Sequence, residues 1–248
     1  MKAGNLNIAM LSIHSNPIGE LGTMNTGGMS VYISEIAREL GKRGHAVDIY
    51  TRQRNGDHRS AIELSENVRL IHLGIAGNGN LSKLILYPYL SEFFQSLEKF
   101  RTGENLDYDI IHSHYWLSGR MGTWAQNAWN RPHVVTFHTL GELKNRVGSD
   151  SREPESRIAN EKKLVNTCHR LVVQTERERD NLIRYYGASE EKIGVVPCGV
   201  NLKLFRPEQK QLARKRLGFE QDDTILLYVG RFEPLKGLDI LLEAMAYL

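Results

Sequence analysis

This sequence contains little of what defines several protein classes. Only two cysteines, Cys168 and Cys198, occur among 248 residues, so a disulfide framework is excluded and a reducing, cytoplasmic location is expected. No apolar run reaches the roughly 18 residues of a membrane span. The N-terminal apolar run is interrupted by His14 and lacks a signal-peptide cleavage site. The formal net charge of +3 is too small to predict nucleic-acid binding.

The dinucleotide fingerprint G-x-G-x-x-G is also missing at the position where it would be needed. Gly27 and Gly28 follow the first apolar run by about a dozen residues, which is not the tight spacing of a nicotinamide site, so an oxidoreductase is disfavoured. The glycine pair precedes a helix-like segment, and free N–H groups at a helix N-terminus favour an anion. Two interpretations therefore stay open for the pair: contact with a phosphate or sugar phosphate, or a plain tight turn.

Short apolar runs alternate with segments of helical periodicity along most of the chain. This alternation predicts an α/β fold with a doubly wound, Rossmann-like parallel sheet of about seven strands. A helix over 81–100 is expected to kink or split at Pro88, and the polar stretch 141–156 is expected to be a loop. The predicted strands are 6–15, 45–51, 68–74, 108–114, 133–139, 170–175 and 192–200.

The last residues predict a change of domain. Residues 1–200 are expected to form the N-terminal Rossmann-like domain, and the polar segment 201–218 to be a linker. An apolar run at 224–230 and a helical pattern at 237–248 predict the start of a second Rossmann-like domain from residue 219. One βα unit cannot bury both of its faces, so the chain is expected to be part of a longer protein.

Several quoted segments together resemble a known enzyme family. They are "GGMSVYISEIARELGKRGHAVDIYT", "HSHYWLSG", "VVTFHTLG", "RLVVQT", "VVPCGVNLKLFRP" and "LLYVGRFEPLKGLDILLEAM", and they are similar to the group 1 (family 4) retaining glycosyltransferases of the GT-B fold. The resemblance implies that the N-terminal domain binds the acceptor and the second domain a nucleotide-diphosphate sugar, most simply a UDP-sugar, with no cofactor and no metal. The family's paired glutamates would lie beyond this chain, so the chain alone is expected to be inactive.

The resemblance also implies roles for particular residues. Arg231 and Lys236 match the pair that binds the donor's diphosphate, with Gly28 beside them, and two fixed cations would stabilise the charge that grows on the leaving group. His138 matches a histidine near the donor sugar. His138, Arg231 and Lys236 are therefore the expected catalytic residues, although no carboxylate partner makes His138 a general base.

The acceptor site implied by the resemblance draws on separate segments. Lys83, Tyr115, Thr139 and Arg157 match positions that hold an acceptor's phosphate, and charge-assisted hydrogen bonds would make such a pocket strong. Gly27, Gly28 and Ser30 complete the expected acceptor site. Ser30 stands where family members that act on inositol phosphate have asparagine, so transfer to fructose 6-phosphate, as in sucrose-phosphate synthase, stays an open alternative.

Other functions remain in competition with transfer. The chain could belong to a phosphosugar-binding module without catalysis, or to a phosphorylase of related fold whose pyridoxal phosphate lysine would lie elsewhere. His112 and His114 have a spacing that suits a metal, but no third ligand is convincing and a structural role is favoured. The expected partners are small molecules, and the sequence leaves a homodimer open.

Overall fold

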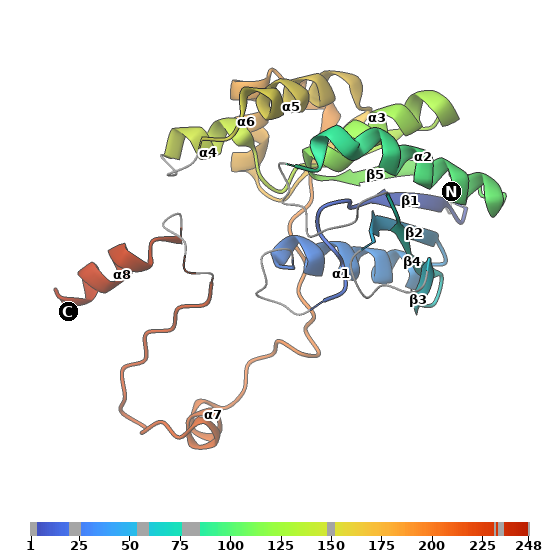
Figure 1. The fold of residues 1–248 in the computed structure, drawn as a ribbon. Coiled ribbons are helices and arrows are strands. Elements are labelled where there is room, and N and C mark those ends of the chain that lie inside the picture. The colour runs from blue at the N-terminus through green and yellow to red at the C-terminus, as the bar shows by residue number, and fades with distance from the viewer. Residues whose placement is uncertain are drawn as a thin grey trace. The chain divides into compact units, whose positions relative to one another are not determined.

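The computed structural model describes residues 4–19, 26–53, 60–75, 85–147, 152–230, 232 and 236–247 (Figure 1). The chain divides into two units, Met1–Val196 and Pro197–Leu248, and each is described by itself. The boundaries predicted for the linker and for the second domain, residues 201 and 219, stay predictions.

The first unit is built on one sheet in the order β3-β4-β2-β1-β5-β6-β7-β8. Every neighbouring pair is parallel except β3 and β4, which form an antiparallel hairpin. The strand order reverses on either side of β1, as in doubly wound sheets, and the predicted α/β class is confirmed. The strands are β1 (Asn7–Leu11), β2 (Ala46–Arg52), β3 (Ala61–Ser65), β4 (Val68–Leu73), β5 (Ile110–His114), β6 (His133–Thr136), β7 (Arg170–Val173) and β8 (Ile193–Val195).

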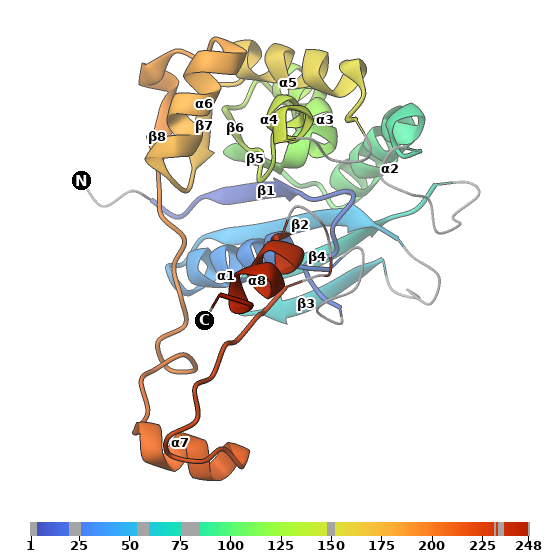
Figure 2. The same cartoon turned by 90° about the vertical axis from the view of Figure 1, so that its left-hand side faces the viewer.

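Helices cover both faces of this sheet. Successive side chains of a strand point to opposite faces, so one strand can contribute residues to two cores. In β1, Ile8 and Met10 pack in one core with Ile33 of α1, whereas Ala9 and Leu11 belong to the other core, with α2, α3, α5 and α6. Figure 2 shows α1 separated from the group formed by α2, α3 and α5. The helices are α1 (Gly28–Lys42), α2 (Leu90–Gly103), α3 (Tyr115–Trp129), α4 (Gly141–Val147), α5 (Glu155–Thr167) and α6 (Glu176–Tyr186), with 3₁₀ turns at Tyr87–Tyr89 and Glu190–Lys192.

Three elements of the first unit differ from the sequence prediction. β3 is an additional strand that pairs with β4 across a turn in which Asn67 has φ +59°. The predicted loop over 141–156 contains α4, a helix whose first N–H is bound by a side chain of α5. Within the described residues, the helix predicted over 81–100 begins as a 3₁₀ turn at Tyr87 and becomes α2 at Leu90, since Pro88 is tolerated only in a first turn.

The second unit contains the helices α7 (Lys210–Leu217) and α8 (Leu238–Met245). The strand predicted at 224–230 is wrong: none of these residues is paired in a strand. Leu227 is 80% and Val229 85% exposed. A strand needs hydrogen-bonded neighbours and an apolar layer to pack against, and the described residues of this unit supply neither at this position.

Candidate functional site

Four of the predicted site residues, three for the acceptor and the catalytic candidate His138, lie near the carboxyl ends of neighbouring strands. Tyr115 directly follows β5, His138 and Thr139 lie between β6 and α4, and Arg157 belongs to the first half of α5. In parallel sheets this edge is where ligands bind. The structure therefore brings Tyr115, Thr139 and Arg157 together from three segments that are distant in the sequence.

Arg157 is the centre of this group. Its side chain has no exposed surface, and its guanidinium carbon lies 4.8 Å from the centre of the Tyr115 ring. Nη2 of Arg157 donates to the carbonyl oxygen of Thr139 at 2.9 Å and to its Oγ1 at 3.0 Å. Because that hydroxyl accepts from the guanidinium, its own proton remains available to donate to an anion. Thr139 is exposed, so the group formed by Tyr115, Thr139 and Arg157 reaches the protein surface at this residue.

Two carboxylates that the sequence analysis overlooked neutralise Arg157. Nε of Arg157 donates to Glu161 at 2.7 Å, and Nη1 lies 2.8 Å from a Glu153 oxygen. Burial by itself would lower the pKa of Arg157, but Glu161 raises it above its ordinary value. Lys144 pairs with Glu153 at 2.9 Å. Part of the signal was present in the sequence, because Arg157 and Glu161 have the i,i+4 spacing of neighbours on one helix face, whereas Glu153 precedes α5.

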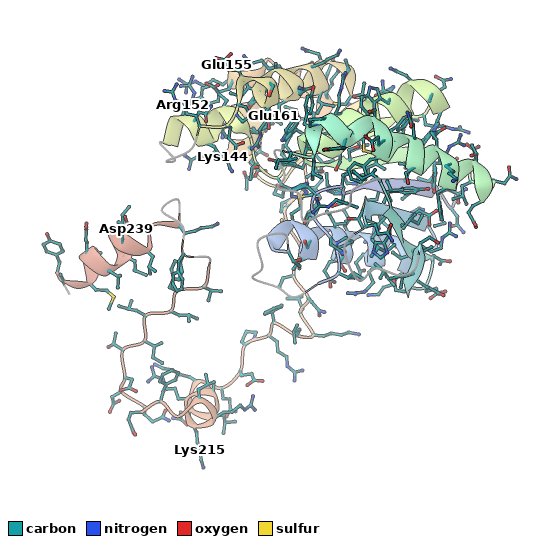
Figure 3. All side chains as sticks on the ribbon, viewed as in Figure 1. Lys144, Arg152, Glu155, Glu161, Lys215 and Asp239 are labelled. Carbon is teal, nitrogen blue, oxygen red and sulfur yellow. The ribbon has the colours of Figure 1, made fainter. Side chains whose placement is uncertain are left out.

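Glu161 also holds the start of α4. Its buried carboxylate accepts from the backbone N–H of Gly141 at 2.9 Å and from the hydroxyl of Tyr186 at 2.6 Å. The Tyr186 oxygen in turn accepts from the N–H of Glu142 at 3.0 Å. Figure 3 labels Glu161 and Lys144 in the region of α4 and α5. The loop that carries His138 and Thr139 is therefore fixed from both ends, by β6 and by this network.

A cluster of histidine rings lies beside this loop. Nδ1 of His114 is 3.0 Å from Nε2 of His138, and the Tyr32 ring meets both rings edge-on, with centres 5.9 Å and 5.1 Å away. His112 hydrogen-bonds Thr136 instead, at 3.0 Å. Tyr115 and His138 have φ +73° and +61°. Non-glycine residues in this region cost about 1–3 kcal/mol each and concentrate at functional sites.

Burial keeps these imidazoles neutral, which predicts a pH-dependent stability. Burial lowers the pKa of His112 to about 4 and those of His133 and His138 to about 3, from an ordinary 6.5. The unfolded chain therefore binds more protons than the folded chain below pH 6.5, so stability falls as the pH falls through this window. Each such proton contributes a slope of about 1.4 kcal/mol per pH unit.

Urea unfolding followed by circular dichroism measures this slope between about pH 6.5 and about pH 5, above the range in which carboxylates dominate. We expect the free energy of unfolding to decrease steadily over this range. A constant free energy of unfolding would contradict neutral buried histidines.

The glycine pair begins α1 without any local need for glycine. Gly27 has φ −157° and ψ −153°, an extended backbone that any residue adopts, and Gly28 does not have a positive φ. A Cβ added at either position meets no atom of the described residues within 4 Å. Both glycines are exposed. Within the described residues neither backbone strain nor packing requires glycine here, and both interpretations of the pair, contact with a ligand and a tight turn, stay predictions.

The positions of the other predicted site residues do not test the roles predicted for them. Ser30 is buried, and its hydroxyl is 2.7 Å from that of Ser15. Lys236 is exposed and directly precedes Gly237, the N-cap of α8 in the second unit. Lys83 and Arg231 lie outside the described residues. The roles assigned to all of these residues stay predictions.

A different hollow lies where α3 ends and β6 begins, at the opposite edge of the sheet from the predicted site. It has a volume of about 430 Å³ and is lined by Gln126, Asn127, Asn130, Arg131, Pro132 and His169. None of the predicted site residues lines it. Within the described ranges no group of three or more His, Cys, Asp or Glu residues could hold a metal ion, and no helix there is long and apolar enough to cross a membrane.

Comparison with known proteins assigns the chain to a family. The sequence model of Glycosyltransferase Family 4 matches residues 26–204. D-inositol 3-phosphate glycosyltransferases from Geodermatophilus obscurus and Corynebacterium diphtheriae are 40% and 38% identical to the chain, covering 96% and 97% of it. The chain spans 54% and 58% of the length of these relatives.

Solved structures agree with this assignment. Sucrose-phosphate synthase from Thermosynechococcus elongatus matches 98% of the chain and 60% of its own chain, with a TM-score of 0.89 and 31% identity. HepE from Anabaena, solved in complex with UDP and glucose, matches 98% of the chain and 58% of its own at a TM-score of 0.65 and 17% identity, which supports the fold alone. The chain therefore belongs to glycosyltransferase family 4 and has the α/β architecture of the GT-B enzymes.

Proposed function

We propose that this chain forms the acceptor side of a glycosyltransferase that moves a hexosyl group from a nucleoside-diphosphate sugar, expected to be a UDP-sugar, to a phosphorylated sugar or inositol. The observation that carries the proposal is the hydroxyl of the exposed residue Thr139, which is hydrogen-bonded to buried Arg157 at 3.0 Å. A hydroxyl polarised by a cation and free to donate suits a phosphate oxygen. Lys83 would supply a further cation.

The proposed transfer retains the configuration of the sugar and uses no enzymic nucleophile. The acceptor hydroxyl attacks the anomeric carbon on the face from which the diphosphate leaves, and a leaving phosphate oxygen takes its proton. Arg231 and Lys236 stabilise the departing charge, while His138 contacts the donor sugar. The protein contributes orientation and exclusion of water. No metal or other cofactor takes part in this scheme. The cytoplasmic location stays a prediction, and the sequence leaves a homodimer open.

Ser30 favours fructose 6-phosphate as a second candidate for the acceptor. Ser30 replaces the asparagine expected in enzymes that act on inositol phosphate, and its hydroxyl is bonded to Ser15 at 2.7 Å. The structural similarity to sucrose-phosphate synthase supports fructose 6-phosphate as the alternative acceptor. Transfer is preferred to a non-catalytic phosphosugar-binding module because the segment with Arg231 and Lys236, which would bind the donor's diphosphate, is present beside the other quoted segments.

Isothermal titration calorimetry of the chain with inositol 1-phosphate and with fructose 6-phosphate tests the acceptor site. Thr139→Val removes the hydroxyl from an exposed position while keeping the shape of the side chain. We expect it to weaken binding of the phosphorylated acceptor by about tenfold or more, the usual effect of losing a hydrogen bond to a charged group.

Thr139→Ser keeps the hydroxyl and is the matched control, expected to bind within about threefold of the unchanged chain. Unphosphorylated inositol and fructose should bind much more weakly than their phosphates. Equal affinities of the valine and serine variants for the phosphorylated acceptor would contradict the proposed site.

A further inference from the structure

His114 and His138 share one hydrogen bond at the carboxyl edge of the sheet. Nδ1 of His114, the last residue of β5, is 3.0 Å from Nε2 of His138 in the loop after β6. His114 has no exposed surface, and His138 is partly exposed. Burial lowers the pKa of both rings far below the ordinary value, so each is a neutral imidazole with a single ring proton.

Because each ring carries a single proton, the tautomers of His114 and His138 depend on each other. A neutral imidazole has one nitrogen that donates and one that accepts, and the bond between the rings uses one proton. If Nδ1 of His114 donates, Nε2 of His138 accepts and the proton of His138 is on Nδ1. If Nε2 of His138 donates, the proton of His114 is on its Nε2. The state of His114 therefore dictates which nitrogen of His138 carries hydrogen.

The surroundings of His114 favour the first arrangement. Nε2 of His114 is buried and has no hydrogen-bond partner among the described residues. The centres of the His112 and Tyr32 rings are 4.2 Å and 5.9 Å from the centre of the His114 ring, and His14 is also near. A buried N–H without an acceptor is a rare and costly defect. A proton on Nδ1 instead has an acceptor 3.0 Å away.

We propose that His114 is a positioning residue that fixes the tautomer of His138 by donating its Nδ1–H to Nε2 of that ring. His138 then carries its proton on Nδ1 and presents a hydrogen-bond donor, not a base, to a ligand. Such a donor suits an oxygen of a sugar hydroxyl or of a phosphate. The identity of that ligand rests on the proposed function, whereas the tautomer is a property of the chain itself.

Two-bond ¹H–¹⁵N correlation spectra of the histidine-labelled chain measure the tautomer directly, because protonated and bare ring nitrogens have distinct shifts and coupling patterns. The signals of His114 and His138 are assigned by their loss in single variants. We expect both rings to show a protonated Nδ1 and a bare Nε2. A protonated Nε2 on His138, or averaging between the two forms, would overturn the proposal.

Variants separate positioning from packing. His114→Phe keeps a ring but removes the donor, and we expect the ratio of Nδ1-protonated to Nε2-protonated His138 to fall about tenfold. His114→Asn places an amide N–H near the position of Nδ1 and is expected to restore the ratio. His112→Phe, the neighbouring buried ring that bonds Thr136, is the matched control and should leave His138 unchanged.

An equal change of the His138 tautomer ratio in His112→Phe and His114→Phe would show a packing effect and would also overturn the proposal. If His114→Phe does not fold, the spectrum of the unchanged chain decides by itself. None of these spectra requires a substrate. A failure of acceptor binding in the calorimetric titration would therefore contradict the proposed function without affecting the tautomer result.

Discussion

Replacing Glu161 by alanine is expected to lower the free energy of unfolding by about 3–5 kcal/mol, because removing one partner of a buried ion pair leaves a charge without compensation. Both side chains of the pair, Arg157 and Glu161, have no exposed surface. Three donors lose their acceptor in the variant: Nε of Arg157, the hydroxyl of Tyr186 and the N–H of Gly141.

Urea unfolding followed by circular dichroism measures this loss, and Glu155→Ala is the matched control. Glu155 belongs to the same helix but is exposed, so its removal should change the free energy of unfolding by less than about 1 kcal/mol. Glu161→Gln, which keeps one acceptor oxygen but no charge, is expected to lie between the two. Equal stability of the Glu155→Ala and Glu161→Ala variants would refute the importance of the network.

Replacing Lys236 by alanine is expected to lower kcat by on the order of 10²-fold or more, measured in a transferase that contains a complete C-terminal domain. In the proposed transfer the departing diphosphate gains charge in the transition state, and a fixed cation would stabilise that charge more strongly there than in the bound substrate. Lys236 is exposed and adjoins the N-terminus of α8, where free N–H groups also favour an anion.

Lys215→Ala provides the matched control for this experiment. Lys215 is an exposed lysine of α7, and no role in the reaction is assigned to it, so the variant should keep kcat within about twofold. Initial rates with saturating donor and acceptor separate an effect on turnover from one on binding. An unchanged kcat in Lys236→Ala would remove this residue from the proposed mechanism.

The architecture was predictable where local patterns and long-range packing agree. β1 is mostly apolar, whereas β5 and β6 combine apolar residues with histidine, serine or threonine. Most residues of the three strands are buried, as expected where helices cover both faces of a parallel sheet, and their order along the chain implies the common edge at which Tyr115 and Thr139 lie. β3 was missed because its half-exposed "AIELS" run pairs only with its neighbour. The strand predicted at 224–230 failed for the opposite reason: its residues have the composition of a strand, but among the described residues no other strand pairs with it.

The site was only partly predictable. Family segments indicated Thr139 and Arg157, and the structure places them in contact, with their phosphate-binding role still to be tested. The carboxylates of Glu153 and Glu161 escaped notice because spacing alone does not show that Arg157 is buried, or that Glu153, which precedes α5, reaches it. The contact between His114, the last residue of β5, and His138, in the loop after β6, depends on how these two adjacent parallel strands align.

The amino-acid sequence by itself determined the α/β class, the family and the set of polar residues that follow the strands, because these depend on composition, periodicity and short segments. The tertiary structure decided which of these groups meet, which charges cancel and which ring nitrogen finds an acceptor. Those outcomes depend on distances of about 3 Å between residues far apart in the chain, and such distances exist only once the sheet and its covering helices have packed.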